Sequence, residues 1–146
     1  MRLVIIESPY GGENKHQNIQ YVHAALADCL ARGEAPFASH ALYTLPGVLD
    51  DELPLERMQG IVAGFAWGDR ADATVVYTDQ GISAGMLQGI ARALALGRPI
   101  EYRSLPGIWT AKCGCGWKAR PEGHWSLKGA DAALDSHLAD CESTNA

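Results

Sequence analysis

Apolar and polar residues alternate between strand-like and helix-like periods over the first hundred positions. Residues 2–7 (RLVIIE) form an apolar run rich in β-branched side chains, which predicts a buried parallel strand. Three further short apolar runs predict three more strands, at residues 35–38, 73–78 and 99–102. Helical spacing follows the first strand, with apolar side chains at Ile19, Val22, Leu26 and Leu30.

Two further helical patterns are expected, over residues 55–70 and 83–96, and residues 40–53 are interpreted as a connection because they contain Pro46 and Gly47. Strands and helices therefore alternate, which favours the α/β class, with a parallel sheet and helices on both faces.

The pattern changes after residue 103. Residues 104–111 (SLPGIWTA) contain proline and glycine and are interpreted as a linker. Residues 112–146 are rich in cysteine, glycine and tryptophan and end in a helical segment at about 128–141. The expected organisation is an α/β domain over residues 1–103, this linker, and a small module.

The module carries four residues with the spacing of a zinc site. Cys113 and Cys115 are separated by one glycine, and after 21 residues His137 and Cys141 follow, four apart on the predicted helix. Three thiolates and one imidazole make the closed tetrahedral shell of a structural zinc. A module of about 30 residues buries little core, so bound metal would supply folding energy. His124 is the alternative ligand, and buried free cysteines are the alternative interpretation.

Composition and charge limit the classes of function. The chain has 146 residues, 47% of them hydrophobic and 20% charged, as in soluble globular proteins. Residues 1–103 carry 8 Lys and Arg against 12 Asp and Glu, and the remainder carries 4 against 5. This balance disfavours nucleic-acid binding, although Trp117 and Trp125 could stack on a base instead of packing over the zinc.

The compartment is expected to be the cytoplasm. No apolar run approaches the roughly 20 residues that cross a bilayer, and the first residues lack the features of a signal peptide. Four cysteines could form two disulfides, but Cys29 stands apart from the other three, and a reducing cytoplasm disfavours such bonds.

Polar and glycine-rich segments follow three of the predicted strands. They are Glu7-Ser8-Pro9-Tyr10-Gly11, Ser39-His40, and residues 78–85 (TDQGISAG). Ligands of open α/β sheets bind beyond the carboxyl ends of the strands, where such segments converge. We therefore expect one cavity at that edge, lined by Glu7, Tyr10, His40, Asp79, Gly81 and Ser83.

At these segments the sequence resembles the nucleoside 2-deoxyribosyltransferase superfamily, in its short phage-type and uncharacterised branches. The resemblance covers residues 2–103 and rests on the Pro9-Tyr10 turn, His40, the Asp79-x-Gly81-x-Ser83-x-Gly85 turn, and the run of Ala93, Gly97 and Pro99. It implies a flavodoxin- or Rossmann-like fold that cleaves or exchanges the N-glycosidic bond of a nucleoside or nucleotide. It also implies self-association and, for a phage-encoded member, the host cytoplasm.

The sequence departs from the superfamily at the catalytic carboxylate. Members use a glutamate nucleophile in the helix after the Asp-x-Gly turn, whereas residues 85–90 here (GMLQGI) contain no acid. Glu7 or Glu56 could substitute, with Asp79 as a further catalytic candidate. The candidates for ligand binding are Pro9, Tyr10, His40, Gly81, Ser83 and Gly85.

Each candidate also has a structural interpretation. Asp79 could cap the following helix, His40 could be a satisfied structural histidine, and Glu56 could lie on a solvated helix face. Two hypotheses therefore stay open: an enzyme acting on a nucleoside or nucleotide, and a module that binds a nucleotide intact while its zinc finger docks a protein partner.

Metal analysis tests the zinc assignment. Purified protein is expected to contain about one zinc per chain, and Cys141→Ser is expected to lose it, because a closed site needs all four ligands. A Cys113/Cys115 double variant that keeps full metal occupancy would show that the assignment is wrong. If His137→Ala retains zinc and His124→Ala loses it, the fourth ligand is His124 rather than His137.

Overall fold

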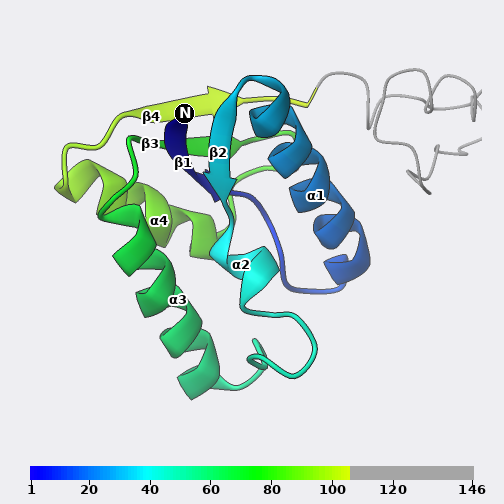
Figure 1. The fold of residues 1–146 in the computed structure, drawn as a ribbon. Helices are drawn as coiled ribbons and strands as arrows, with labels where there is room; N and C mark the ends of the chain where they lie inside the picture. The colour runs from blue at the N-terminus through cyan, green and yellow to red at the C-terminus, as the bar shows by residue number, and fades with distance from the viewer. Residues whose placement is uncertain (106–146) are drawn as a thin grey trace, which may run out of the picture. The chain divides into compact units, whose positions relative to one another are not determined.

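A four-stranded parallel sheet with strand order β2-β1-β3-β4 organises the first 104 residues (Figure 1). The computed structural model describes residues 1–105, and the chain divides into two units after Ser104. The strands are β1 (Arg2–Glu7), β2 (Glu34–Phe37), β3 (Ala73–Tyr77) and β4 (Ile100–Arg103). The helices are α1 (Lys15–Ala31), α2 (Ser39–Leu42), α3 (Pro54–Gly68) and α4 (Ala84–Ala95). The predicted α/β class is confirmed.

The predictions for the C-terminal module concern residues that the structure does not describe. Most of the predicted linker and the four proposed zinc ligands, Cys113, Cys115, His137 and Cys141, lie outside residues 1–105. The zinc site therefore stays a prediction.

The order of the strands places a topological switch point between β1 and β3. Helix α1 connects β1 to its neighbour β2, whereas α3 carries the chain back across β1 to β3, and α4 continues to β4. Figure 1 shows α1 on one face of the sheet, and α3 and α4 on the other. The segments that follow β1 and β3 therefore diverge toward opposite faces, which is where doubly wound sheets bind ligands.

Alternating side chains of the strands build the core on both faces of the sheet. Val76 of β3 packs with Met86 and Ile90 of α4, and all three are buried. The next residue, Tyr77, points to the opposite face, where its hydroxyl donates to the Asp28 carboxylate of α1 at 2.6 Å. This alternation follows from the two-residue period of a strand.

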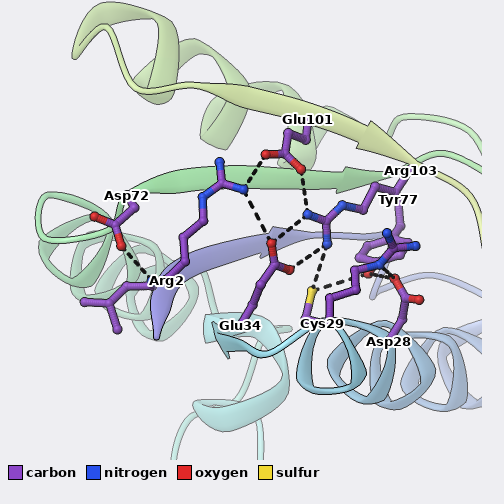
Figure 2. Close-up of polar contacts among 10 residues, drawn as sticks. Arg2, Asp28, Cys29, Glu34, Asp72, Tyr77, Glu101 and Arg103 are labelled. Atoms are coloured by element: carbon purple, nitrogen blue, oxygen red, sulfur yellow. Dashed lines mark hydrogen bonds and ion pairs between the residues drawn. The ribbon is translucent and has the colours of Figure 1, made fainter.

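A network of four charged side chains connects the two outer strands across the face that α1 covers (Figure 2). Arg103 of β4 donates to both carboxylate oxygens of Glu34 on β2, at 2.7 and 2.8 Å, and to Glu101 at 2.6 Å. Arg2 of β1 contacts the same two carboxylates. The side chains of Arg103 and Glu34 are only 10% and 8% exposed. Hydrogen bonds from Arg103 lower the pKa of Glu34, so this carboxylate stays ionised and paired.

The Cys29 thiol lies beside this network, 3.3 Å from the Tyr77 hydroxyl and 3.6 Å from the Arg103 guanidinium. It is buried and free, so the described part of the chain contains no disulfide. Within residues 1–105, no helix combines the length and the apolar character needed to cross a bilayer.

Replacing Glu34 with glutamine is expected to destabilise the domain by about 3 kcal/mol, because it leaves the buried Arg103 charge with an incomplete set of partners. The matched control is Asp69→Asn, which removes the exposed pair between Asp69 and Arg92 and is expected to cost less than about 1 kcal/mol. Urea denaturation measures both values. Equal losses would show that the network contributes no more than a surface pair.

Candidate active site

A cavity lies over β1, between α2, α3 and α4. Its floor includes Ile5 and Glu7, which share the face of β1 opposite to α1. Ser39 and His40 of α2 form one wall, and Arg98, from the turn before β4, also lines it. The cavity thus lies over one face of the sheet, beneath the helices, rather than beyond its carboxyl edge alone.

Glycines at four-residue spacing keep this space open. Gly60, Gly64 and Gly68 of α3 all line the cavity, as do Gly85 and Gly89 of α4. Residues four apart share one face of a helix, so each helix presents a row of positions without side chains to the cavity. This four-residue spacing of glycines is a sequence signal from which the cavity could be predicted.

Glu7 is the most unusual polar group of the cavity. Among residues 1–105, no hydrogen-bond donor reaches its carboxyl group, although the side chain is only partly accessible through the cavity mouth. Burial raises the pKa of Glu7 from 4.5 to about 8, and the positive charge of Arg98 opposes this rise only in part. The carboxyl group is therefore mostly protonated at neutral pH.

Arg98 is held firmly, which fixes where its charge acts. Its Nε donates to the Thr74 hydroxyl at 2.9 Å, and Nη1 donates to the Gly68 carbonyl at 2.5 Å. Both partners are buried parts of the core. The guanidinium is thus anchored on the protein rather than free to fold over Glu7.

His40 supplies a neutral imidazole to the same cavity. Burial lowers the pKa of His40 to about 4, so the ring is uncharged at physiological pH. Its Nε2 lies 2.8 Å from the Ser8 hydroxyl, and its ring contacts Tyr10 edge-on at 5.7 Å between centroids. The Ser8 hydroxyl, Tyr10 and His40 thus form one polar and aromatic wall.

The charged residues at the start of α3 are already engaged in local interactions. The Glu56 carboxylate accepts a hydrogen bond from the Asp50 amide at 2.6 Å, and Arg57 pairs with Asp51 at 2.6 Å. Ser83 caps α4, because its hydroxyl accepts the Met86 amide at 3.3 Å. These residues line the cavity but are less available than Glu7.

The structure brings together six of the nine candidates from the sequence: Glu7, Tyr10, His40, Glu56, Ser83 and Gly85. Pro9, Asp79 and Gly81 are not among the lining residues. Asp79 instead accepts a hydrogen bond at 2.6 Å from Tyr21 of α1, on the other side of the switch point. The expectation that Asp79 and Glu7 share one cavity is therefore corrected, since α1 supplies the partner of Asp79.

Most of the other lining residues were absent from the predicted set, among them the polar residues Ser8, Ser39 and Arg98. Ser8 and Ser39 adjoin predicted candidates in the sequence, and Arg98 precedes the last strand. Nothing in the local pattern showed that Arg98 would turn back under α3. Within residues 1–105, no group of three or more His, Cys, Asp or Glu side chains could hold a metal ion.

Comparison with known proteins supports this fold. Residues 2–103 match the family described as Domain of unknown function (DUF7768). This chain belongs to that family. None of the curated proteins is similar enough in sequence to match it.

A solved structure characterising a 2-deoxyribosyltransferase from the psychrotolerant bacterium Bacillus psychrosaccharolyticus has a similar fold. The TM-score is 0.51, the sequence identity is 19%, and the match covers 70% of this chain and 72% of that chain. At this identity the likeness establishes the fold. The predicted resemblance to deoxyribosyltransferases is thereby confirmed for the fold.

The raised pKa of Glu7 predicts a pH dependence of stability. Between pH 4.5 and about 8, the unfolded chain releases the Glu7 proton and the folded protein keeps it, so stability falls as the pH rises. Glu7→Gln removes this dependence. The free energy of unfolding of the variant minus that of wild type is therefore expected to increase by up to a few kcal/mol from pH 5 to pH 8, at about 1.4 kcal/mol per pKa unit.

Urea denaturation at several pH values measures the difference between the two proteins. His40 contributes a loss of stability at low pH in both of them, because its neutral form is the buried one, and this contribution cancels in the comparison. Parallel stability curves for wild type and Glu7→Gln would contradict the raised pKa.

Proposed function

We propose that the protein cleaves or exchanges the N-glycosidic bond of a nucleoside or nucleotide, with Glu7 as the proton donor to the leaving base. The observation that carries the proposal is the Glu7 carboxyl group, which lies in the cavity without a hydrogen-bond partner among residues 1–105. A carboxyl group kept protonated at neutral pH suits general acid catalysis.

The position of Glu7 supports this assignment. The superfamily that the sequence resembles carries its glutamate in the helix corresponding to α4, where residues 85–90 of this chain have no acid. Glu7 approaches that same helix from β1, because its carboxyl group lies against Gly89. The cavity therefore contains a carboxyl group although the helix itself has none.

The reaction needs a second reactant to take the place of the leaving base on the sugar, and this reactant is a water molecule or an acceptor base. As the bond between the sugar carbon and the base nitrogen breaks, Glu7 gives its proton to the base. Water adds to the sugar carbon in hydrolysis and returns a proton to Glu7, and an incoming base does the same in exchange. Ser8 and Ser39 offer hydroxyls to the sugar, and Tyr10 offers an aromatic surface.

A second candidate function is binding without cleavage. The observation that favours it is the absence of an acid from residues 85–90, which removes the expected nucleophile. In that case a nucleotide would raise the melting temperature by mass action and be recovered intact. The proposed zinc finger would then dock a protein partner.

Incubation with a panel of nucleosides and their 5′-monophosphates, followed by chromatography of the released base, tests catalysis. We expect one substrate class to yield free base, and Glu7→Gln to lose about 100-fold or more of the rate, as removal of a general acid does.

The control variant is Glu56→Gln, which alters the other cavity glutamate while its partner Asp50 remains. It is expected to keep most of the activity. Full activity in Glu7→Gln would show that the site is misplaced. Intact substrates in the presence of a stabilised wild-type protein would favour the binding function.

A further inference from the structure

Gly89 lies in the middle of α4, directly against the Glu7 side chain. A Cβ atom built on Gly89 would be 1.8 Å from Oε1, 2.3 Å from Cδ and 2.8 Å from Oε2 of Glu7. All three distances are far shorter than a van der Waals contact. The carboxyl group thus occupies the space that any side chain at position 89 would fill.

Other cavity glycines of the helices do not show such a conflict with Glu7. A Cβ atom on Gly85, one turn earlier in α4, would come no closer than 3.5 Å, to Arg57. On Gly68 of α3 it would lie 3.3 Å from Arg98. The contact with the carboxyl group is therefore particular to Gly89.

Local sequence preference does not account for Gly89. Glycine is unfavourable in the interior of a helix relative to alanine, because it loses more backbone entropy on folding. Gly89 is buried and lies in the middle of α4 (Ala84–Ala95), away from both helix ends, so it has no capping role. A contact outside the helix is therefore the physical reason that the fold requires glycine there.

We propose that Gly89 is a positioning residue, which lets the Glu7 carboxyl group lie between β1 and the backbone of α4. The catalytic consequence of this placement rests on the proposed function, but the placement itself does not. A methyl group at position 89 would expel the carboxyl group toward the open part of the cavity, because the backbone of a packed helix cannot withdraw.

The expelled carboxyl group would meet a different electrostatic environment. The charged groups around the cavity are Arg98 before β4, Glu56 and Arg57 on α3, and Asp51 before α3. The other titratable groups are His40 on α2 and the tyrosines Tyr10 and Tyr43. Helix α4 itself contributes Gln88, which is uncharged. Water at the cavity mouth favours ionisation, so displacement from α4 is expected to return Glu7 toward its ordinary acidity.

The first measurement is a carbon-13 NMR titration of the Glu7 carboxyl carbon in wild type, Gly89→Ala and the control Gly85→Ala. The midpoint is expected to fall by at least one pH unit in Gly89→Ala and to stay within a few tenths of a unit of wild type in Gly85→Ala. An unchanged midpoint in Gly89→Ala would overturn the proposal.

The second measurement remains informative if Gly89→Ala folds poorly. In wild type, alanine at position 89 is expected to lower the urea midpoint. In a Glu7→Ala background the carboxyl group is gone, so the same substitution is expected to raise the midpoint through better helix propensity. The same change in both backgrounds would contradict the proposed contact.

Neither measurement requires turnover. If wild type cleaves no nucleoside or nucleotide, the coupling between Gly89 and Glu7 can still be measured. If the coupling is absent, cleavage by wild type can still be observed. The two proposals can therefore fail separately.

Discussion

The close approach of the Glu7 carboxyl group to the backbone of α4 is the contact on which the account of the cavity depends. It requires a residue without a side chain at position 89, and the glycines of α3 extend the same condition to the opposite wall. Side chains on these rows would fill the space above β1 with a packed core, as Val76 and Met86 do over the neighbouring strand β3. The cavity is thus built by omission of side chains.

The two faces of the sheet shift the pKa of a glutamate in opposite directions. Glu34, on the face of α1, receives two hydrogen bonds from Arg103, and its pKa is lowered. Glu7, on the face of α3 and α4, receives none from the described residues, and its pKa rises to about 8. A paired carboxylate stabilises the fold, whereas an unpaired carboxyl group in a cavity is available to a ligand. The contrast supports a structural role for Glu34 and a chemical one for Glu7.

Most of the fold could be predicted from the sequence, because the apolar runs of the strands and the helical spacing between them are strong local signals. The strand at residues 2–7 was placed correctly, and the other elements differ by one or two residues at their ends. Helix α2 (Ser39–Leu42), which overlaps the predicted connection 40–53, was not predicted, since four residues carry too little periodicity to predict a helix.

The site was less predictable than the fold. Convergence at the strand ends grouped Glu7, Tyr10 and His40, which line the same cavity, but it could not tell which face each segment would join. Asp79 accepts a hydrogen bond from Tyr21 of α1, and no local sequence pattern indicates that partner. The place of Arg98 in the cavity depends on its hydrogen bond to Thr74, a tertiary contact that no local sequence pattern indicates either.

The most direct test of the central claim is the dependence of kcat/KM on pH, which reports the pKa values of the free enzyme. If Glu7 donates its proton, kcat/KM for the cleaved substrate is level near neutral pH and falls as the pH rises through about 8, the pKa of the buried carboxyl group. A value of kcat/KM that instead rises through the same range would show that the ionised carboxylate is the active form, and it would contradict the role of Glu7 as a general acid.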